Sequence, residues 1–498
     1  MSPSTQGALA LRAAPRGETA KPLVPEQAAE FDLFLRNQSK APLVVNSLDN
    51  RFTPIIHLFD AQGRPLGHYT QADGRARIVG DSAPKARESI RTETLAPGEE
   101  GTTWVNVWSR TNPYPPGTYG FEATHQAGGA TVLASARLPF EIVAAQVGSA
   151  ALGYDKPIRT NTVLAWLATP KGGRTARLLI RLSGFTSHQA VQFGATPHGE
   201  FPLNSRVSVS ATPPDGALPA VGWVGVVSGD TLQLIQHNLS MPMSRPPAAT
   251  LPSADAVPVP RFPNRGRAVF LATGTSAKGP VLIGVKASAS DTALHPWSVS
   301  LSHKPVYSAC AFMMAGAITV LLASDDDRIS RLSRLEVSED GAVISAERVI
   351  RESTNEVLAM VTDLRGGEPL SFVVLEADRE RHDYLAFVKI AANGALKATG
   401  LRAVAGWPAV EVNGQRQPER ARDLILETDD QGLPWLALTD SRGDFRGGRM
   451  DGALSLLREG RLGRALFPHI GALARSVSFA CFTPDGMLFH SGSGAVGH

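Results

Sequence analysis

The clearest hydrophobic pattern in the chain is a pair of apolar runs separated by a polar turn, at residues 423–440. Leu424 to Leu426 form the first run, Leu433 to Leu438 form the second, and turn-forming residues from Asp429 to Gly432 separate them. Asp and Gly accept the backbone conformations that tight turns require, so this pattern predicts a β-hairpin. Units of this kind recur about seven times at intervals of about fifty residues, which is typical of a repeat architecture.

The repeated unit can be followed by its turn through most of the chain. Related strand–turn segments lie at residues 164–173, 222–230, 268–279, 309–316, 358–369 and 478–486. Each interval is long enough for a small sheet, and sheets stacked in a ring bury their faces and shield their edges. We therefore predict a β-propeller of about seven blades over residues 146–498. Because the last unit is too short for four strands, residues 147–165 are expected to complete it and close the ring.

The first part of the chain carries shorter strands with a different spacing. Strand-like runs lie at residues 29–39, 42–48, 53–63, 88–108, 115–125 and 130–144. A Leu-Ala-Pro-Gly-Glu turn at Leu95–Glu99 precedes one strand, and a Pro-Gly-Thr-Tyr turn at Pro116–Tyr119 opens another. This pattern resembles bacterial immunoglobulin-like domains, and the resemblance implies an immunoglobulin-like β-sandwich over residues 1–145. Trp104, Trp108 and Tyr119 are expected in its core or at its rim.

Residues 241–266 interrupt the repeats. They contain seven prolines. Proline lacks the N–H group that a central strand donates to its neighbours, so this segment is predicted to be a long surface loop without central strands.

A second segment, Tyr307–Ser324, contains eighteen residues without a charge, which is the threshold length for a membrane span. Residues 313–316 fall where other units turn, so two ordinary strands are the better interpretation. No membrane span is predicted.

Composition agrees with many short strands. The chain of 498 residues contains 47 Gly and 36 Pro, and only 19% of its residues are charged, which favours an all-β fold. The formal net charge of +3 is small for this length and gives no reason to expect a nucleic-acid partner. The two cysteines, Cys310 and Cys481, lie in similar apolar runs and are interpreted as buried side chains. No secretory leader is visible, so a cytoplasmic protein is expected, or a secreted one if a leader has been removed.

Motifs that would indicate a particular chemistry are absent from the sequence. It contains no nucleophile elbow, Walker loop or zinc-protease motif, so no catalytic residue, cofactor or metal site is predicted. The nearest approach to a metal-ligand group is His188 with the His-Gly-Glu segment at residues 198–200, and these histidines are interpreted as surface-loop residues.

The densest positive stretch supplies the candidate binding residues. They are Arg442, Arg446, Arg449, Arg458, Arg461 and Arg464. Such a stretch suits an acidic protein partner or a carboxylate ligand, although a solvated face is the simpler interpretation.

Together these features favour a non-enzymatic protein-binding or structural scaffold component, within a larger bacterial-type assembly. The alternative is a propeller hydrolase or lyase that acts on a carbohydrate or peptide through acidic or His side chains in the funnel of the ring. A third option, an extracellular carbohydrate-binding or surface adhesin, would require a leader. Partner identity and oligomeric state stay open.

Overall fold

A computed structural model gives the fold. It describes residues 7–49, 54–70, 91–107, 114–154, 162–186, 189–192, 196–212, 221–229, 231–238, 248–252, 254–258, 267–288, 291–302, 305–314, 316–325 and 329–362, then the strands β29 to β40 with residues 485–487. The described chain is all-β apart from one short 3₁₀ turn, η2 (Gly17–Ala20).

The N-terminal unit, defined here as residues 7–142, is built from antiparallel sheets around a core of its own. One sheet has β1 (Leu9–Pro15), β2 (Ala29–Asn37) and β7 (Glu100–Val107); another has β10 (Leu138–Ile142), β8 (Gly117–Gly128), β4 (Ile55–Phe59), β5 (Pro65–Thr70) and β9 (Thr131–Ala134); β3 (Leu43–Asn46) pairs with β6 (Thr92–Leu95). Buried and less buried residues alternate along β2, as expected for a strand with one face on a core. The rings of Phe31 and Phe121 stack across that core with centroids 3.8 Å apart.

Of the two turns that the sequence singled out, Leu95–Glu99 connects β6 to β7, and Pro116–Tyr119 forms the start of β8, which begins at Gly117. Gly98, between β6 and β7, has a φ of +79°, which glycine adopts without steric cost. The Tyr119 hydroxyl donates a hydrogen bond of 2.6 Å to the Pro115 carbonyl, and the ring is buried as expected. Trp104 is half-buried on β7, and Trp108 lies outside the described residues.

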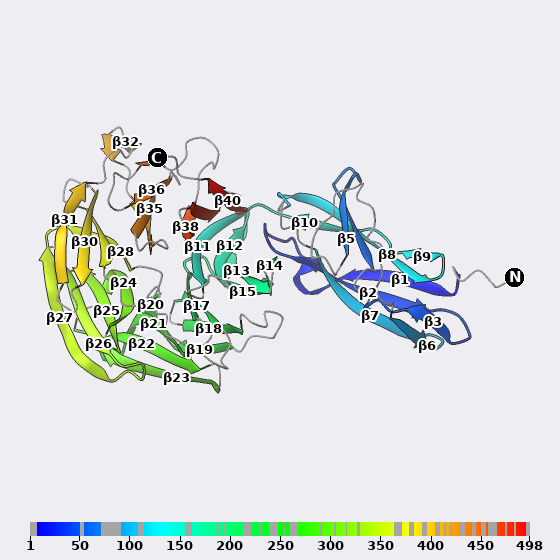
Figure 1. Cartoon of the computed structure of the whole chain (residues 1–498), viewed down its shortest axis with the longest axis horizontal. Coiled ribbons are helices and arrows are strands. Elements are labelled where there is room, and N and C mark those ends of the chain that lie inside the picture. Colours follow the sequence, from blue (N-terminus) through cyan, green and yellow to red (C-terminus); the bar gives the residue numbers. More distant parts are fainter. Residues whose placement is uncertain are drawn as a thin grey trace.

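The rest of the chain forms a β-propeller, in which successive antiparallel sheets follow one another around a ring (Figure 1). The first sheet contains β11 (Ala145–Tyr154), β12 (Thr162–Pro170), β13 (Thr175–Thr186), β14 (Gln189–Gln192) and β15 (Thr196–Pro202). The second sheet contains β16 (Arg206–Thr212), β17 (Val221–Ser228), β18 (Thr231–Asn238) and β19 (Ala248–Pro252). The third contains β20 (Ala254–Pro258), β21 (Arg267–Ser276), β22 (Gly279–Ser288) and β23 (Asp291–Ser300). The fourth contains β24 (Pro305–Met314), β25 (Ala317–Asp325), β26 (Ser330–Val337) and β27 (Val343–Ser353).

The later sheets continue the same order. They comprise β28 (Glu356–Thr362), β29 (Ser371–Ala377), β30 (Asp383–Ile390) and β31 (Leu396–Ala403); β34 (Ala421–Thr428), β35 (Pro434–Asp440), β36 (Phe445–Arg449) and β37 (Ser455–Leu456); and β38 (Leu466–Leu473), β39 (Ser476–Phe482) and β40 (Leu488–Gly494). A separate ribbon pairs β32 (Ala409–Val412) with β33 (Gln415–Pro418). The hairpin predicted at residues 423–440 is the antiparallel pair β34–β35, whose turn lies outside the described residues.

The proline-rich stretch at 241–266 differs from its predicted loop, because β19 and β20 lie inside it. Both strands are at the edge of their sheets. Pro252 and Pro258 are the last residues of these strands, positions where proline interrupts no central ladder. The prolines therefore argue against central strands, but they do not exclude edge strands.

The uncharged segment at 307–324 folds as the two strands β24 and β25, as predicted. Gly316 has a φ of +81° at the turn between them. Among the described residues, no helix is long and apolar enough to cross a membrane. Cys310 on β24 is fully buried as expected, and burial raises the pKa of its thiol to about 12. Cys481 lies on β39.

The described strands do not show the predicted closure of the ring, in which residues 147–165 would add a strand to the last sheet. β11, the expected donor, pairs with β12 in the first sheet, from Ala145 opposite Pro170 to Tyr154 opposite Thr162. The last sheet has the order β38–β39–β40. It lies directly beside β11 and β12 in Figure 1. The prediction of strand donation was therefore wrong for the described strands, because β11 pairs with β12 in the first sheet; packed side chains and a backbone hydrogen bond connect the two ends of the ring.

Neighbouring sheets of the ring approach closely, and Gly225 on β17 marks one such contact. A Cβ atom at this position would lie 2.1 Å from Cζ of Phe270 on β21. Gly225→Ala is therefore expected to destabilise the protein by about 1–3 kcal/mol, because the added methyl overpacks the contact. Urea denaturation measures the effect. Gly148→Ala is the matched control, since its Cβ would meet only an ordinary contact at 3.9 Å, and equal stability of the two variants would contradict the prediction.

Candidate functional site

The arginine stretch predicted as a binding surface is only partly described. Arg446 and Arg449 lie on β36, where Arg446 is opposite Leu438 and Arg449 is opposite Trp435 of β35. Arg442, Arg458, Arg461 and Arg464 lie outside the described residues. The structure thus places two of these positions on one strand, and the proposal that all six form one surface stays a prediction.

The best-defined candidate site is the junction between the N-terminal unit and the propeller. It begins with residues 22–28, the junction loop, which connects η2 to β2. Leu23 forms a parallel bridge with Ile142: the Leu23 N–H donates to the Glu141 carbonyl, and the Val143 N–H donates to the Leu23 carbonyl, each at 2.8 Å. These bonds hold the junction loop beside the segment through which the chain leaves β10 and enters β11.

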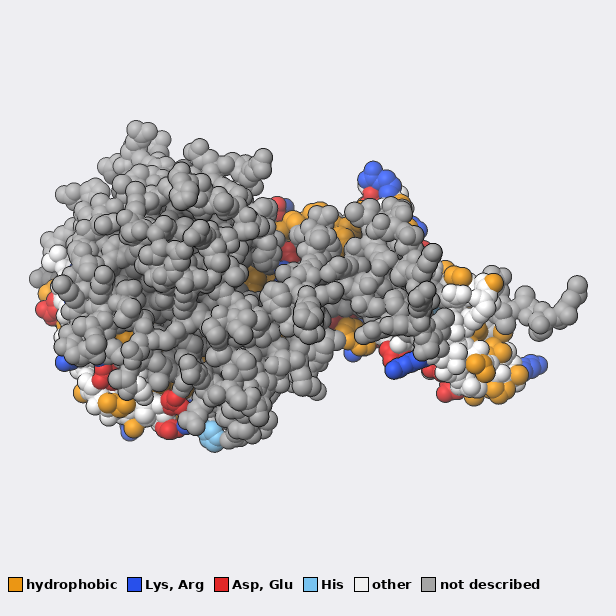
Figure 2. Space-filling view, in the orientation of Figure 1, with side chains coloured by type: hydrophobic (Ala, Val, Ile, Leu, Met, Phe, Trp, Pro, Cys, Tyr) orange, Lys and Arg blue, Asp and Glu red, His pale blue; other side chains and the backbone are white. Residues whose placement is uncertain are grey.

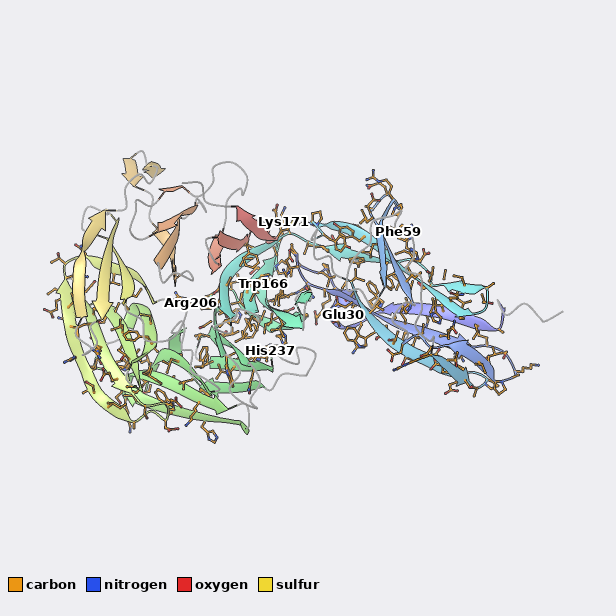
Figure 3. The ribbon with its side chains drawn as sticks, in the orientation of Figure 1. Glu30, Phe59, Trp166, Lys171, Arg206 and His237 are labelled. Carbon is orange, nitrogen blue, oxygen red and sulfur yellow. The ribbon has the colours of Figure 1, made fainter. Side chains whose placement is uncertain are left out.

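The junction loop inserts Val24 into the seam between the first and last sheets of the ring. Val24, Trp166 on β12 and Phe482 on β39 are each fully buried in one apolar cluster. The rings of Trp166 and Phe482 lie 5.3 Å apart, and the Ala145 N–H donates a 3.0 Å hydrogen bond to the Asp485 carbonyl. Figure 3 shows Trp166 within the first sheet. Among the described strands none is shared across this seam, which is held by the Ala145–Asp485 backbone hydrogen bond and by packed side chains, including Val24 from the N-terminal unit.

Two buried arginines on β13 add a polar layer to the junction. Arg177 Nη1 donates to the Pro22 carbonyl at 2.6 Å and to Gln27 Oε1 at 3.5 Å. Arg181 Nη1 lies 3.5 Å from Glu26 Oε2, and both side chains are almost completely buried. Their spacing of four residues places the two arginines on the same face of the strand. The two guanidinium groups of the ring thus contact three acceptors of the junction loop: the Glu26 carboxylate, the Gln27 side-chain oxygen and the Pro22 carbonyl.

Glu26 stands in an unusual backbone conformation. Its φ of +69° makes it the one non-glycine residue in the left-handed region among the described residues. This conformation costs a non-glycine residue free energy, so it persists where the surroundings impose it. The ion pair with Arg181 and the turn between Val24 and Gln27, closed by a 3.1 Å backbone hydrogen bond, impose it here.

The polar contacts of the junction hold the junction loop against β13. The Glu26 carboxylate and the Arg181 guanidinium are engaged with each other in a buried pair. Breaking such a pair leaves a charge in a low-dielectric environment, so the pair strongly favours one relative placement of its two elements. The arrangement therefore suits a fixed connection between the N-terminal unit and the ring.

No pattern in the sequence predicted this site. One signal was available: Arg177 and Arg181 interrupt the otherwise apolar run of β13, and arginine is rarely buried without a partner. The junction loop itself gives no comparable signal, because its partners lie about 150 residues away in sequence.

A second polar feature joins the first two sheets of the ring. His198 on β15 and His237 on β18 are in contact, with ring centroids 5.2 Å apart and ring planes at 90°. Burial lowers the pKa of His198 to about 4; burial, and then the proximity of His198, lowers the pKa of His237 to about 3. The interpretation of His198 as a surface-loop residue was wrong, since it lies on a strand between sheets; His188 lies outside the described residues.

These pKa values predict acid sensitivity. An unfolded histidine has a pKa near 6.5, so below that pH the unfolded chain binds protons that the folded chain does not. The free energy of unfolding should fall as pH decreases from about 6.5 towards 4, by up to about 1.4 kcal/mol per pH unit for each histidine. Urea denaturation at about pH 7 and pH 5, in chelator-treated buffer, measures the slope. His237→Gln should show a shallower slope; an unchanged slope would contradict the assignment.

The outward face of the β1–β2–β7 sheet carries charged and aromatic side chains that contact one another. Arg12 lies over the Phe34 ring at 3.9 Å, and Arg16 lies over Trp104 and pairs with Asp32 at 3.0 Å. Figure 2 shows charged side chains of both signs among apolar ones on this unit. Glu30, at the end nearest the ring in Figure 3, has a carboxyl pKa raised by burial. These contacts place an arginine over each of the two aromatic rings on this surface.

Comparison with known proteins gives similarity of shape only. No family model matches the chain, and no curated protein is similar to it in sequence. Solved structures that superpose include a fucose-recognising six-bladed propeller lectin from the fungus Aleuria aurantia (10% identity, TM-score 0.36, covering 70% of this chain and 95% of the lectin). A lectin from Burkholderia pseudomallei is 16% identical, with a TM-score of 0.33, and the match covers 63% of this chain and 94% of the lectin. A protein from Lactobacillus plantarum is 12% identical, with a TM-score of 0.35, and the match covers 68% of this chain and 91% of that protein. At TM-scores this low, these superpositions carry no argument.

Proposed function

We propose that the chain is a non-enzymatic binding protein, a rigid scaffold that holds an N-terminal unit and a propeller in one fixed relation and offers their surfaces to other proteins. The single observation that carries this proposal is the buried Glu26–Arg181 pair across the junction. Two charges are costly to remove from water, and their attraction offsets that cost only in one geometry. A flexible tether between independent units would need no such pair.

The proposal includes a more detailed architecture. Residues 1–145 are an immunoglobulin-like sandwich and residues 146–498 a propeller of about seven blades. The Tyr119 hydroxyl bond to a carbonyl four residues upstream supports the first assignment, because a similar tyrosine bond occurs in immunoglobulin-like folds. The succession of small antiparallel sheets supports the second.

Protein partners are the proposed ligands. A rigid body with two surfaces loses little conformational entropy when a partner bridges them, which is the advantage of preorganisation. The arginines from Arg442 to Arg464 are the proposed contact for an acidic partner, because guanidinium groups bind carboxylates in a bidentate manner.

Affinity purification of the full chain from its native host under gentle lysis, followed by size-exclusion chromatography, tests the proposal. The expected result is a defined complex that contains other proteins. The matched comparison is a chain with Arg442, Arg446 and Arg449 replaced by glutamine, which should release an acidic partner and leave the urea midpoint unchanged. Recovery of the native chain only as a free monomer would refute the scaffold role.

A further inference from the structure

The contact between His198 and His237 is built by an irregular piece of backbone. The pairing of β13 with β15 shifts register between Arg177 and Leu179, and Gly199 has a φ of +125°. A bulge of this kind redirects the neighbouring side chains, and bulges are frequent beside functional sites. Here the bulge adjoins His198, whose ring meets a ring from the next sheet.

The geometry of the two rings matches joint coordination of one ion. Their centroids lie 5.2 Å apart and their planes are perpendicular. In a tetrahedral site with metal–nitrogen bonds of about 2.0–2.1 Å, two imidazole ligands have centroids about 5 Å apart. The separation of the two rings is therefore compatible with one ion bound by a nitrogen of each ring.

The donor atoms suit a metal. His237 is only 4% exposed, and within the described part of the chain its Nε2 makes no hydrogen bond. A buried polar nitrogen without a partner is unfavourable, and a ligand would satisfy it. Neutral imidazole is the metal-binding form, and both rings are neutral at physiological pH because burial lowers their pKa values.

We propose that His198 and His237 together bind one divalent transition-metal ion of the zinc, copper or nickel class, which imidazole nitrogen favours over magnesium or calcium. Among the described residues, no group of three or more His, Cys, Asp or Glu side chains gathers around an ion. Of the described residues, His198 and His237 are therefore the two proposed ligands. Such an ion would tie the first sheet of the ring to the second.

Zinc titrated alone into chelator-treated full-length protein, followed by isothermal titration calorimetry, tests the proposal. Wild-type protein should bind one equivalent of zinc more tightly than any further zinc. His237→Gln and His198→Gln should each weaken this event about tenfold or more, as expected when a ligand is lost. His295→Gln, which removes a histidine on β23 outside the pair, is the matched control and should bind as wild type does. Equal zinc uptake by all three variants would mean adventitious binding only and would overturn the site.

A measurement on the wild-type protein remains decisive if a variant fails to fold. One equivalent of Cu²⁺ added to the full chain should give an electron paramagnetic resonance spectrum with hyperfine coupling to two imidazole nitrogens. Coupling to a single nitrogen, or to none, would refute the proposal. Magnesium should neither bind nor compete at the same concentrations.

Discussion

Replacing Arg181 by methionine is expected to lower the free energy of unfolding by about 3–5 kcal/mol, since the change leaves the Glu26 carboxylate buried beside the ring without its counter-charge. Glu26 and Arg181 are 4% and 3% exposed, so water cannot replace the lost partner. Urea denaturation of the full chain measures the effect.

Two further variants separate the loss of the pair from the loss of side-chain volume. Adding Glu26→Gln to Arg181→Met should recover part of the stability, because no unpaired charge then remains. Arg64→Met, which breaks the largely exposed pair with Asp60, should change the midpoint far less. If Arg181→Met and Arg64→Met had equal effects, the junction pair would not fix the two units.

Replacing Phe482 by alanine is expected to destabilise the seam of the ring by about 3–5 kcal/mol, the usual cost of removing a buried phenylalanine ring. Phe482 is fully buried in one apolar cluster with Trp166 and Val24, and among the described strands the last sheet shares none with the first. Amide hydrogen exchange should therefore speed up in β11, β12 and β38–β40 before it does so in β24–β27.

Phe140→Ala is the matched control for this experiment. Phe140 belongs to the core of the N-terminal unit, where it meets the Phe31 ring. Its removal should raise exchange in that unit and leave β38–β40 protected. If Phe482→Ala raised exchange evenly around the ring, or not at the seam, side-chain closure would be contradicted.

The sequence predicted those features that depend on neighbouring residues. Alternation and turn residues are local, so the hairpin at 423–440, the turn at Gly98 and the split of 307–324 into two strands could all be predicted. The proline-rich stretch shows the limit of this reasoning, because proline composition cannot tell a loop from an edge strand.

The candidate sites depend on contacts between distant residues, which one sequence does not encode in any readable pattern. Arg177 and Pro22 are 155 residues apart, and Val24 meets Phe482 from the other end of the chain. Strand donation at the seam was predicted from unit length alone, although side-chain packing can hold a ring closed as well. His198 was assigned to a surface loop because the spacing of the histidines alone indicates no common site, whereas the structure places it on β15.

The central claim is that the junction loop holds the N-terminal unit and the propeller as one rigid body. Spin labels at Val44→Cys and Leu203→Cys, two positions that are 72% and 56% exposed, report the distance between the two parts by pulsed electron paramagnetic resonance. The labels are attached in a Cys481→Ser background, since Cys310 is fully buried. The account predicts one narrow distance distribution, which broadens in the Arg181→Met variant. A broad distribution in the otherwise native chain would contradict it.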